Sequence, residues 1–381
     1  MWQDYYSVSS IKEALELLGK YGDKARIVAG GTDLILEMER GVRKGVEVLI
    51  DVSRIAGLDQ IVLDEQDHIH LGPMVTHNAC VASKLIVERA FPLAQACWDV
   101  GAPQIRNRGT VAGNLVTASP ANDTITPLMA LGAKVSLASS TGQREVALSD
   151  FYTGVRKTVL KPDEMLVDIY FPAMKTNQRG AFIKLGLRRA QAISVVNAAV
   201  ILSFAAGEMT FLDQLPILDA KITLGAVAPT IMHADLAQVH LLERRLDQET
   251  MEKTAELAQQ AATPIDDVRS SAEYRKEMVR VCVHRSLRNI AAGTERQAFP
   301  EDPVLLWGKN QATITHPLAQ GTHHNETIAI DTRINGKDYH FETGQNKTLL
   351  HLLREEAGLT GSKEGCSEGE CGACTVFLDG L

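Results

Sequence analysis

The chain of 381 residues contains no apolar run that approaches the roughly 20 residues of a membrane-spanning helix. It also has no excess of basic residues, because 39 Lys and Arg stand against 47 Asp and Glu, a net charge of −8. Since nucleic acids bind to basic faces, this balance argues against a nucleic-acid partner. The N-terminal stretch MWQDYY lacks the basic and apolar regions of a signal peptide. The composition is that of an ordinary globular protein of two or three domains.

Cysteine is scarce, with six residues in the whole chain, so a disulfide scaffold is not expected. Three of the six, Cys366, Cys371 and Cys374, lie in the stretch GCSEGECGACT at 365–375. Their C-x4-C-x2-C spacing is that of a plant-type [2Fe–2S] ligand loop. The interleaved glycines let such a loop wrap closely around a cluster and direct N–H groups at its sulfurs. A zinc knuckle or a set of buried thiols is the alternative, but zinc ribbons use two C-x2-C pairs and this stretch has one.

A [2Fe–2S] cluster takes four thiolates, and this loop supplies three. Cys80, Cys97 and Cys282 lie far upstream, in segments with the pattern of a different domain. Either the fourth ligand lies beyond Leu381 or the loop holds no cluster. We expect the first, because 375–380 has the pattern of a strand that enters a turn. Few cysteines, a ligand loop and no signal peptide together predict a reducing, cytoplasmic location.

The N-terminal half lacks the G-x-G-x-x-G fingerprint of Rossmann dinucleotide sites. Instead, a short buried strand predicted at 25–29 runs into Gly30-Gly31-Thr32-Asp33, and a helical pattern follows at 34–39. Successive N–H groups in such a turn can converge on a phosphate, although many Gly-Gly pairs are only turns. A dinucleotide bound here would therefore lie in a fold other than the Rossmann fold.

A second loop of interest spans 101–114 and reads GAPQIRNRGTVAGN. Its small residues and its two arginines, Arg106 and Arg108, suit a flavin ring and a pyrophosphate, but arginines of this kind are more often surface ion-pair partners. Asp123 then opens a helix predicted to end near Leu131. It is either an N-terminal helix acid or an acceptor for the hydroxyl groups of a ribityl or ribose chain.

The rest of the chain shows an α+β pattern. A capping box, Ser10 to Glu13, begins the first helix. Further helices are predicted at 78–98, 248–262 and 272–291, and strands at 46–52, 68–72, 134–138, 165–171, 181–186, 195–204 and 221–227.

The C-terminal part begins with a linker predicted at 293–325, in which His323 and His324 are expected to be solvated and to bind no metal. A β-hairpin follows, with strands at 328–333 and 337–342 around an Asn335-Gly336 turn. A helix at 348–357 then leads into the cysteine loop. Hairpin, helix and cysteine loop follow in the order of a β-grasp ferredoxin.

Three of these stretches, AGGTD at 29–33, IRNRGTVAGN at 105–114 and SPAND at 119–123, resemble the FAD-binding (medium) subunit of the molybdenum hydroxylases. That family includes xanthine dehydrogenase, carbon monoxide dehydrogenase and aldehyde oxidoreductases. The resemblance covers about residues 1–292 and continues through ITLGAVAP at 222–229 and PIDDVRSSAEYR at 264–275. Residues 326–381 resemble the first half of the small iron–sulfur subunit of the same system.

The resemblance implies a vanillyl-alcohol-oxidase-like FAD domain of two α+β lobes at 1–175. An α+β flavoprotein subdomain at 176–292, a linker at 293–325 and a partial β-grasp [2Fe–2S] domain at 326–381 would follow. It further implies two pyrophosphate turns, a residue near the sugar chain and two residues against the flavin. The first turn would consist of Ile27, Val28, Ala29, Gly30, Gly31, Thr32, Asp33 and Leu34, and the second of Thr110, Val111, Ala112, Gly113 and Asn114. Asp123 would lie near the sugar chain, and Leu166 and Lys184 would lie against the flavin. Ala112 stands where the family usually has glycine, which is tolerable if its φ is negative.

By the same resemblance the chain is an electron-transfer subunit that binds FAD and, through Cys366, Cys371 and Cys374, a [2Fe–2S] cluster. Its expected partners are a molybdopterin-containing large subunit, a further iron–sulfur subunit, and NAD or another electron acceptor. No catalytic side chain is expected, because the cofactors carry out the chemistry. Two alternatives stay open: a stand-alone flavoprotein oxidase that needs no cluster, and an assembly remnant that binds FAD without turnover.

Overall fold

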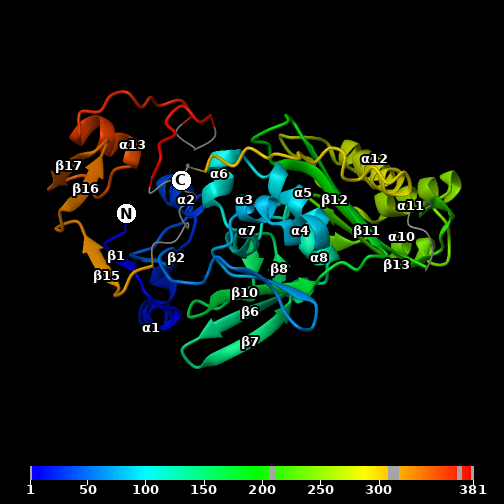
Figure 1. Cartoon of the computed structure of the whole chain (residues 1–381), viewed down its shortest axis with the longest axis horizontal. Helices are drawn as coiled ribbons and strands as arrows, with labels where there is room; N and C mark the ends of the chain where they lie inside the picture. The colour runs from blue at the N-terminus through cyan, green and yellow to red at the C-terminus, as the bar shows by residue number, and fades with distance from the viewer. Residues whose placement is uncertain (1, 206–211, 308–316, 367–370, 379–381) are drawn as a thin grey trace.

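A computed structural model describes residues 2–205, 212–307, 317–366 and 371–378, and three sheets with their flanking helices make up most of it (Figure 1). The first sheet has the order β15-β1-β3-β2, in which β1, β3 and β2 run parallel and β15 is antiparallel to β1. Its strands are Asp4–Ser7 (β1), Ala25–Val28 (β2), Val48–Asp51 (β3) and Thr322–Asn325 (β15).

The helix between β1 and β2 begins at the predicted N-cap, Ser10, but the return bond of the capping box goes to the residue before it. The Ser10 hydroxyl accepts a hydrogen bond from the Glu13 backbone N–H (3.2 Å), and the Glu13 carboxylate accepts one from the N–H of Ser9 (2.9 Å). Buried Ala14, Leu15 and Leu18 pack this helix on the sheet. The elements here are α1 (Ile11–Tyr21), a 3₁₀ turn (Gly22–Lys24) and α2 (Leu34–Glu39).

The second sheet is antiparallel, with the order β4-β5-β10-β6-β7. Its strands are Ile61–Leu63 (β4), His68–Leu71 (β5), Lys134–Ser139 (β6), Gly142–Ala147 (β7) and Met165–Pro172 (β10). A layer of short helices lies between this sheet and the third sheet (Figure 1). These helices are α3 (His77–Ala82), α4 (Lys84–Arg89), α5 (Phe91–Asp99), α6 (Pro103–Arg108), α7 (Val111–Thr117) and α8 (Ile125–Ala130). After β7 the chain forms a short helix, α9 (Leu148–Phe151), and then a two-stranded pair, β8 (Tyr152–Gly154) and β9 (Lys157–Thr158).

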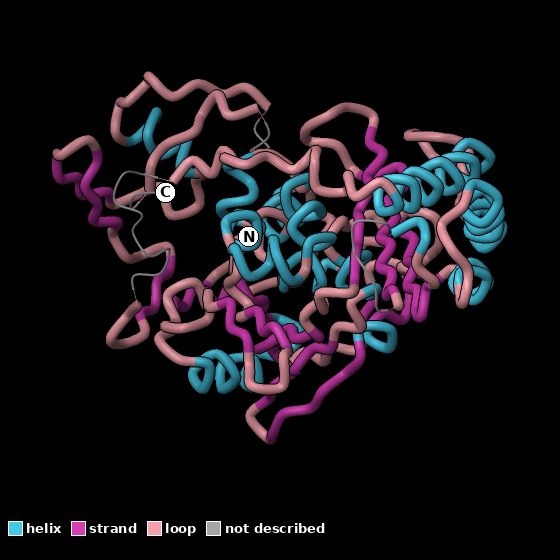
Figure 2. Tube along the Cα trace, turned by 45° about the vertical axis from the view of Figure 1, so that its right-hand side comes forward, coloured by secondary structure: helices cyan, strands magenta, loops and turns pink. Residues whose placement is uncertain are grey.

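The third sheet is also antiparallel and is covered by long helices (Figure 2). Its order is β11-β12-β13-β14, and buried residues of β12 and of the two longest helices share one core. The elements are Gln178–Gly186 (β11), Ser194–Phe204 (β12), a 3₁₀ turn (Leu212–Gln214), Ile217–Gly225 (β13), Met232–His233 (β14), Asp235–Leu241 (α10), Gln248–Ala261 (α11) and Ala272–Ala291 (α12).

The predicted helix over 78–98 is wrong, because the structure divides it into α3, α4 and α5. Ser83 is extended, and its hydroxyl accepts from the N–H of Ile86, so that it caps a new helix. Pro92 has no N–H to bond the carbonyl of residue 88, so the chain begins a further helix there. Even the longest described helices are too short or too polar to cross a bilayer.

The end of the predicted linker is not a linker. Residues 322–325 form β15, the edge strand of the first sheet. There His323 Nε2 donates to the Asp4 carboxylate (2.6 Å), and the His323 ring stacks on Tyr6 with ring centroids 4.5 Å apart. His323 and His324 are exposed, as expected, but the segment that carries them is a strand, because it pairs with β1 from the other end of the chain.

The C-terminal hairpin is confirmed as β16 (Ile330–Ile334) and β17 (Lys337–Phe341), with Asn335 and Gly336 both at positive φ in the turn. The predicted helix at 348–357 is present as one helical turn, α13 (Leu349–His351), followed by a π-helical stretch at Leu352–Glu356. The predicted strand after Cys374 is not formed at 375–378, where no described residue pairs with it. Residues 379 and 380 of that expected strand and turn lie outside the described residues.

On the second sheet, His70 bridges two carboxylates, Asp168 at 2.7 Å and Asp64 at 3.3 Å. Burial lowers the pKa of His70, but these hydrogen bonds outweigh it and raise the pKa above its usual value. A raised folded-state pKa contributes stability below the unfolded value of about 6.5, and this is lost as pH rises through the folded value. We expect His70→Gln to lower the melting temperature most at about pH 5.5, with the difference narrowing above pH 7. A difference that is constant across this range would contradict the assignment.

Candidate cofactor cleft

Two glycine-bearing turns from distant parts of the chain pack backbone against backbone. A Cβ added to Gly30 would lie 1.9 Å from the carbonyl oxygen of Arg108 and 3.1 Å from the Cα of Gly109. Residue 30 therefore has no room for a side chain. The next residue, Gly31, has a φ of +74°, a conformation that glycine adopts without steric cost. The structure thus explains why both residues of the first turn are glycines: residue 30 has no space for a side chain, and residue 31 has a positive φ.

The second turn is held to the start of α3 by two main-chain hydrogen bonds. The N–H of His77 donates to Gly109 O (3.1 Å), and the N–H of Val111 donates to Val75 O (3.0 Å). Thr110 then caps α7, because its hydroxyl accepts from the N–H of Gly113 (2.9 Å). The predicted loop at 101–114 is thus wrong as a loop, since α6 and the start of α7 occupy most of it. Ala112 is the second residue of α7 and is not among the residues with positive φ, which meets the condition for alanine there.

A cleft of about 660 Å³ opens beside the two turns. Its walls come from the first sheet and α2, from α6 and α7, from the second sheet and from the end of β11 with the residues that follow. Of the predicted FAD-contacting residues, all but Val28 and Val111 line it: Ile27, Ala29, Gly30, Gly31, Thr32, Asp33, Leu34, Thr110, Ala112, Gly113, Asn114, Asp123, Leu166 and Lys184. Val111 is fully buried behind the cleft wall. The tertiary fold thus gathers residues that are up to 157 positions apart in the sequence, from 27 to 184.

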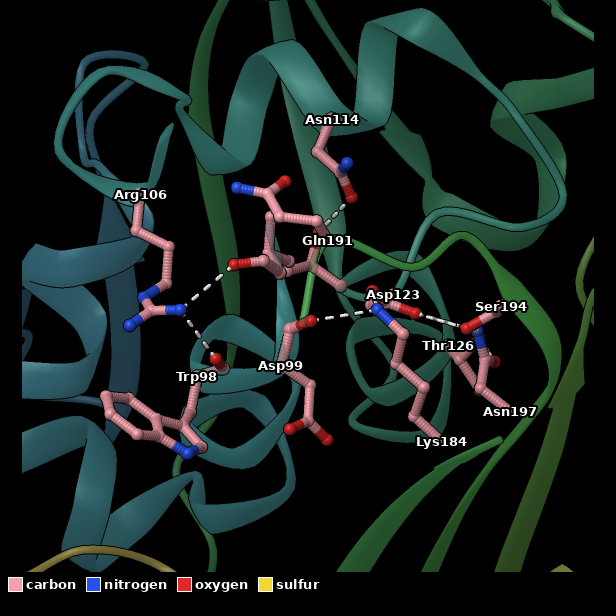
Figure 3. A network of polar contacts seen from close by, with 12 residues as sticks. Trp98, Asp99, Arg106, Asn114, Asp123, Thr126, Lys184, Gln191, Ser194 and Asn197 are labelled. Carbon is pink, nitrogen blue, oxygen red and sulfur yellow. Dashed lines mark hydrogen bonds and ion pairs between the residues drawn. The ribbon is translucent and has the colours of Figure 1, made fainter. Parts of the chain in front are cut away.

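At one end of the cleft a buried polar network surrounds Asp123 (Figure 3). Its carboxylate accepts hydrogen bonds from Lys184 Nζ (2.6 Å), Ser194 Oγ (2.6 Å) and Asn197 Nδ2 (3.3 Å). Burial raises the pKa of Asp123, and the nearby Lys184 ammonium partly offsets this. The reading of Asp123 as only an N-terminal helix acid is wrong, because the carboxylate bonds to β11 and β12 and α8 begins two residues later. Sequence reasoning named Asp123 and Lys184 separately, and the fold makes them an ion pair.

Arg106, on α6, is held inside the protein by hydrogen bonds and by an aromatic ring. Its side chain is buried, lies over the Trp98 ring at 4.5 Å, and donates to Asn78 Oδ1 (3.0 Å) and to the carbonyls of Trp98 (3.0 Å) and Val100 (3.2 Å). Figure 3 shows its bond to Trp98. The surface ion-pair reading is therefore wrong for Arg106, whereas Arg108 is exposed. Burial lowers the pKa of Arg106, but so strong a base stays charged at neutral pH.

Sequence reasoning missed His77, which also lines the cleft. Its ring is buried, and its Nδ1 has no hydrogen-bond partner among the residues that the structure describes. Burial and the nearby Arg106 charge lower the pKa of His77 to about 3, so the imidazole is neutral at physiological pH. A buried polar atom without a partner at the edge of a cleft is the kind of group that a bound molecule or a water satisfies. No local motif distinguishes this histidine, so only the fold could identify it.

The cysteine loop places backbone N–H groups against two of the three predicted ligand sulfurs. The N–H of Cys371 donates to Cys366 Sγ (3.3 Å), and the N–H of Ala373 donates to Cys371 Sγ (3.5 Å). A Cβ on Gly365 would lie 2.5 Å from Cys371 Sγ, so glycine is needed there. N–H groups directed at sulfur are typical of iron–sulfur ligand loops. Residues 367–370, including Gly369, lie outside the described residues, and within the described part of the chain no three His, Cys, Asp or Glu side chains are close enough to hold a metal ion.

Comparison with known proteins gives three family matches. Residues 2–174 match the FAD binding domain in molybdopterin dehydrogenase, residues 181–290 match the CO dehydrogenase flavoprotein C-terminal domain, and residues 332–380 match the 2Fe-2S iron-sulfur cluster binding domain. The carbon monoxide dehydrogenase medium chain of Afipia carboxidovorans is 32% identical over 289 residues, which cover 76% of this chain and 96% of that protein. The nicotinate dehydrogenase FAD-subunit of Eubacterium barkeri is 31% identical, with 72% and 92% covered.

Solved structures agree with these relatives. The carbon monoxide dehydrogenase of Hydrogenophaga pseudoflava aligns with a TM-score of 0.71 at 29% identity, covering 77% of this chain and 98% of the other. The fold, the cleft and the matches define a flavoprotein subunit of an oxidoreductase whose cofactors are FAD and a 2Fe–2S cluster. More narrowly, the chain belongs to the family of FAD-binding subunits of molybdenum hydroxylases, with a 2Fe–2S domain on the same chain.

Asp99, whose backbone carbonyl accepts a hydrogen bond from Lys184 Nζ (2.8 Å), offers a test of the electrostatics beside the Asp123–Lys184 pair. Burial raises the pKa of its carboxyl to about 6, against the opposing effect of Lys184. A carboxyl whose folded-state pKa is raised loses stability as pH rises from about 4 to about 6. Because Asn resembles the neutral acid, we expect Asp99→Asn to match the wild type at pH 4 and to be more stable, by up to about 3 kcal/mol, at pH 7.5. Thermal unfolding at the two pH values checks this, and equal stability at pH 7.5 would contradict it.

Proposed function

We propose that this chain carries electrons from a molybdenum-containing large subunit, through its 2Fe–2S domain, to its flavin domain and on to an acceptor such as NAD. The observation that carries the proposal is the contact between the two glycine turns on the wall of the cleft, on a chain that also holds the cysteine loop. The relatives support it, since they are named as the medium chain of carbon monoxide dehydrogenase and the FAD-subunit of nicotinate dehydrogenase.

In this proposal the two turns hold the diphosphate of FAD, with residues 27–34 on one side and 110–114 on the other. Asp123 lies near the sugar chain, and Leu166 and Lys184 lie against the flavin. When bound, FAD accepts electrons singly or in pairs, and a 2Fe–2S cluster carries one at a time. The side chains of this chain bind, orient and shield the cofactor. The buried Asp123–Lys184 pair keeps that wall of the cleft rigid, because either partner alone would be an uncompensated buried charge.

Cys366, Cys371 and Cys374 are the proposed cluster ligands. The N–H groups that already face two of their sulfurs support this assignment, because such bonds stabilise thiolates. Further proposed partners are a molybdopterin-containing large subunit and another iron–sulfur subunit. Cys80, Cys97 and Cys282 are buried free thiols, which fits a reducing compartment such as the cytoplasm.

For the architecture, we propose that residues 1–175 form a two-lobed FAD fold of the vanillyl-alcohol-oxidase type and that 176–292 form the flavoprotein subdomain. Residues 326–381 would be the first part of a β-grasp ferredoxin domain, after the connecting segment 293–325. The alternative of a stand-alone oxidase is disfavoured by the 2Fe–2S domain, since an oxidase that reacts with oxygen at flavin needs no cluster.

Substitution of Gly30 tests the cofactor assignment. We expect Gly30→Ala to weaken FAD binding about tenfold or more, because its Cβ would push the two turns apart. FAD affinity is measured by quenching of flavin fluorescence. Gly19→Ala is the matched control, because a Cβ there meets no atom closer than Ser140 Oγ at 3.9 Å. Equal affinities of the two variants would place the diphosphate elsewhere.

The visible spectrum separates the proposed function from its alternatives. The purified full-length product should show flavin bands together with the broad reddish absorption of a 2Fe–2S cluster, and replacing Cys371 with Ser should remove the latter alone. Flavin bands alone, with reduction by a small alcohol, would favour the stand-alone oxidase. Flavin bands without reduction by any partner subunit would favour the assembly remnant, and a colourless product that does not take up FAD would end the proposal.

A further inference from the structure

The segment between the flavin domain and the 2Fe–2S domain lies outside all three family matches, which end at residue 290 and resume at 332. Much of it is nevertheless docked on the flavin domain. Arg296 lies over the Phe91 ring at 4.2 Å and donates to Val87 O (2.7 Å). Phe299 packs edge-on against Phe91, with ring centroids 5.6 Å apart, and against Trp98 at 6.5 Å. In Figure 1 this stretch runs from the end of α12 back across the central helices to α6.

Farther along, the segment is bound through its own backbone by two buried asparagines. Asn78 Nδ2 donates to Leu305 O (3.0 Å), and Asn107 Nδ2 donates to Leu306 O (3.4 Å). Trp307 Nε1 donates in turn to Asn107 Oδ1 (3.0 Å). Leu306 has a φ of +53°, which is unfavourable for leucine and persists only where the surroundings determine it. The contact is therefore specific and not a chance approach of a flexible linker.

The same asparagines support the second glycine turn. Asn78 Oδ1 accepts from Arg106 Nε (3.0 Å), and Asn78 Nδ2 also donates to Asn107 Oδ1 (2.7 Å). Both Arg106 and Asn107 belong to α6, which ends at Arg108, where the Gly30 turn rests. The cysteine loop approaches this helix as well, since a Cβ on Gly372 would lie 3.2 Å from Gln104 Nε2.

The last part of the segment is fastened to the first sheet. The N–H of Leu318 donates to Arg54 O (3.2 Å), and β15 pairs with β1 over four residues. The Asp4–His323 contact and the stacking of His323 on Tyr6 add side-chain bonds to this pairing. The 2Fe–2S domain therefore begins at a fixed point on the flavin domain.

We propose that residues 295–307 and 318–325, here called the strap, are a positioning element that braces the second glycine turn through Asn78 and Asn107 and docks the 2Fe–2S domain beside α6 of the same chain. The chain's own C-terminal domain thus occupies this surface. No separate iron–sulfur subunit is therefore expected to bind at this place. The inference rests on the proposed function, because the braced turn is the one assigned to FAD.

Two variants of the full chain separate the two roles of the strap. Trp307→Phe removes one donor to Asn107 but keeps an aromatic ring, and we expect it to weaken FAD binding about two- to tenfold and to speed hydrogen exchange in α6. Asp4→Ala removes the partner of His323 far from the cleft. It should speed exchange at 322–325 and raise the radius of gyration measured by X-ray scattering, with FAD affinity unchanged. Val304→Ala, at an exposed position of the strap, is the matched control and should change none of these quantities.

The outcomes are distinguishable from failure of the proposed function. If the unmodified chain binds no FAD, the proposed function fails, while slow exchange in the strap would still show docking. If the unmodified chain binds FAD but the strap exchanges as fast as an unstructured peptide, the strap proposal is overturned and FAD binding stands. If Trp307→Phe binds FAD as tightly as Val304→Ala does, the bracing role is overturned. If Asp4→Ala alters neither the hydrogen exchange at 322–325 nor the radius of gyration, the docking role is overturned.

Discussion

The cleft depends on one contact, in which the backbone at Gly30 rests on the backbone at Arg108 and Gly109. Main-chain atoms can approach this closely only where no Cβ stands between them, so a glycine at residue 30 decides whether two distant turns can share one wall. The remaining features keep both turns in place. On one side β2 leads into the Gly30 turn, and on the other the hydrogen bonds of Val75 and His77 hold the second turn. A shift of either turn would separate the two backbones and break the wall of the cleft where they meet.

Two charged side chains behind this wall are buried, and packing brings hydrogen-bond partners to both of them. Arg106 has three carbonyl or amide oxygens around it in place of a carboxylate, and Lys184 has Asp123. Leaving such a group without a partner costs far more than the bond itself contributes, so the network restricts the cleft to one arrangement. A rigid cleft is useful to a flavin subunit, because cofactors that exchange electrons need fixed relative positions and rigid walls lower the ordering cost of binding.

Prediction from sequence succeeded where the signal is local. The N-cap at Ser10 and the Asn335-Gly336 hairpin each depend on a few adjacent residues, and both are confirmed. It failed where a distant segment decides. The helix expected over 78–98 breaks where Ser83 and Pro92 allow new helix starts, and the linker expected up to residue 325 becomes a strand because β1 offers an open edge. His77, which lines the cleft, and Asn78, which bonds to α6, carry no local signature, so their roles could not be recognised from the sequence.

By itself, the sequence determined the chemistry that is available: glycines where close approach is needed, thiols in a cluster-ligand spacing, and a family resemblance that names the cofactors. Those properties belong to residue types and short spacings, which do not depend on the rest of the fold. Only the tertiary structure decided that the Gly30 and Gly109 turns touch, that Asp123 pairs with Lys184, and that residues 295–307 lie across the central helices. These are contacts between segments tens to hundreds of residues apart, and they form because the burial of three sheets and their helices leaves each segment one place to lie.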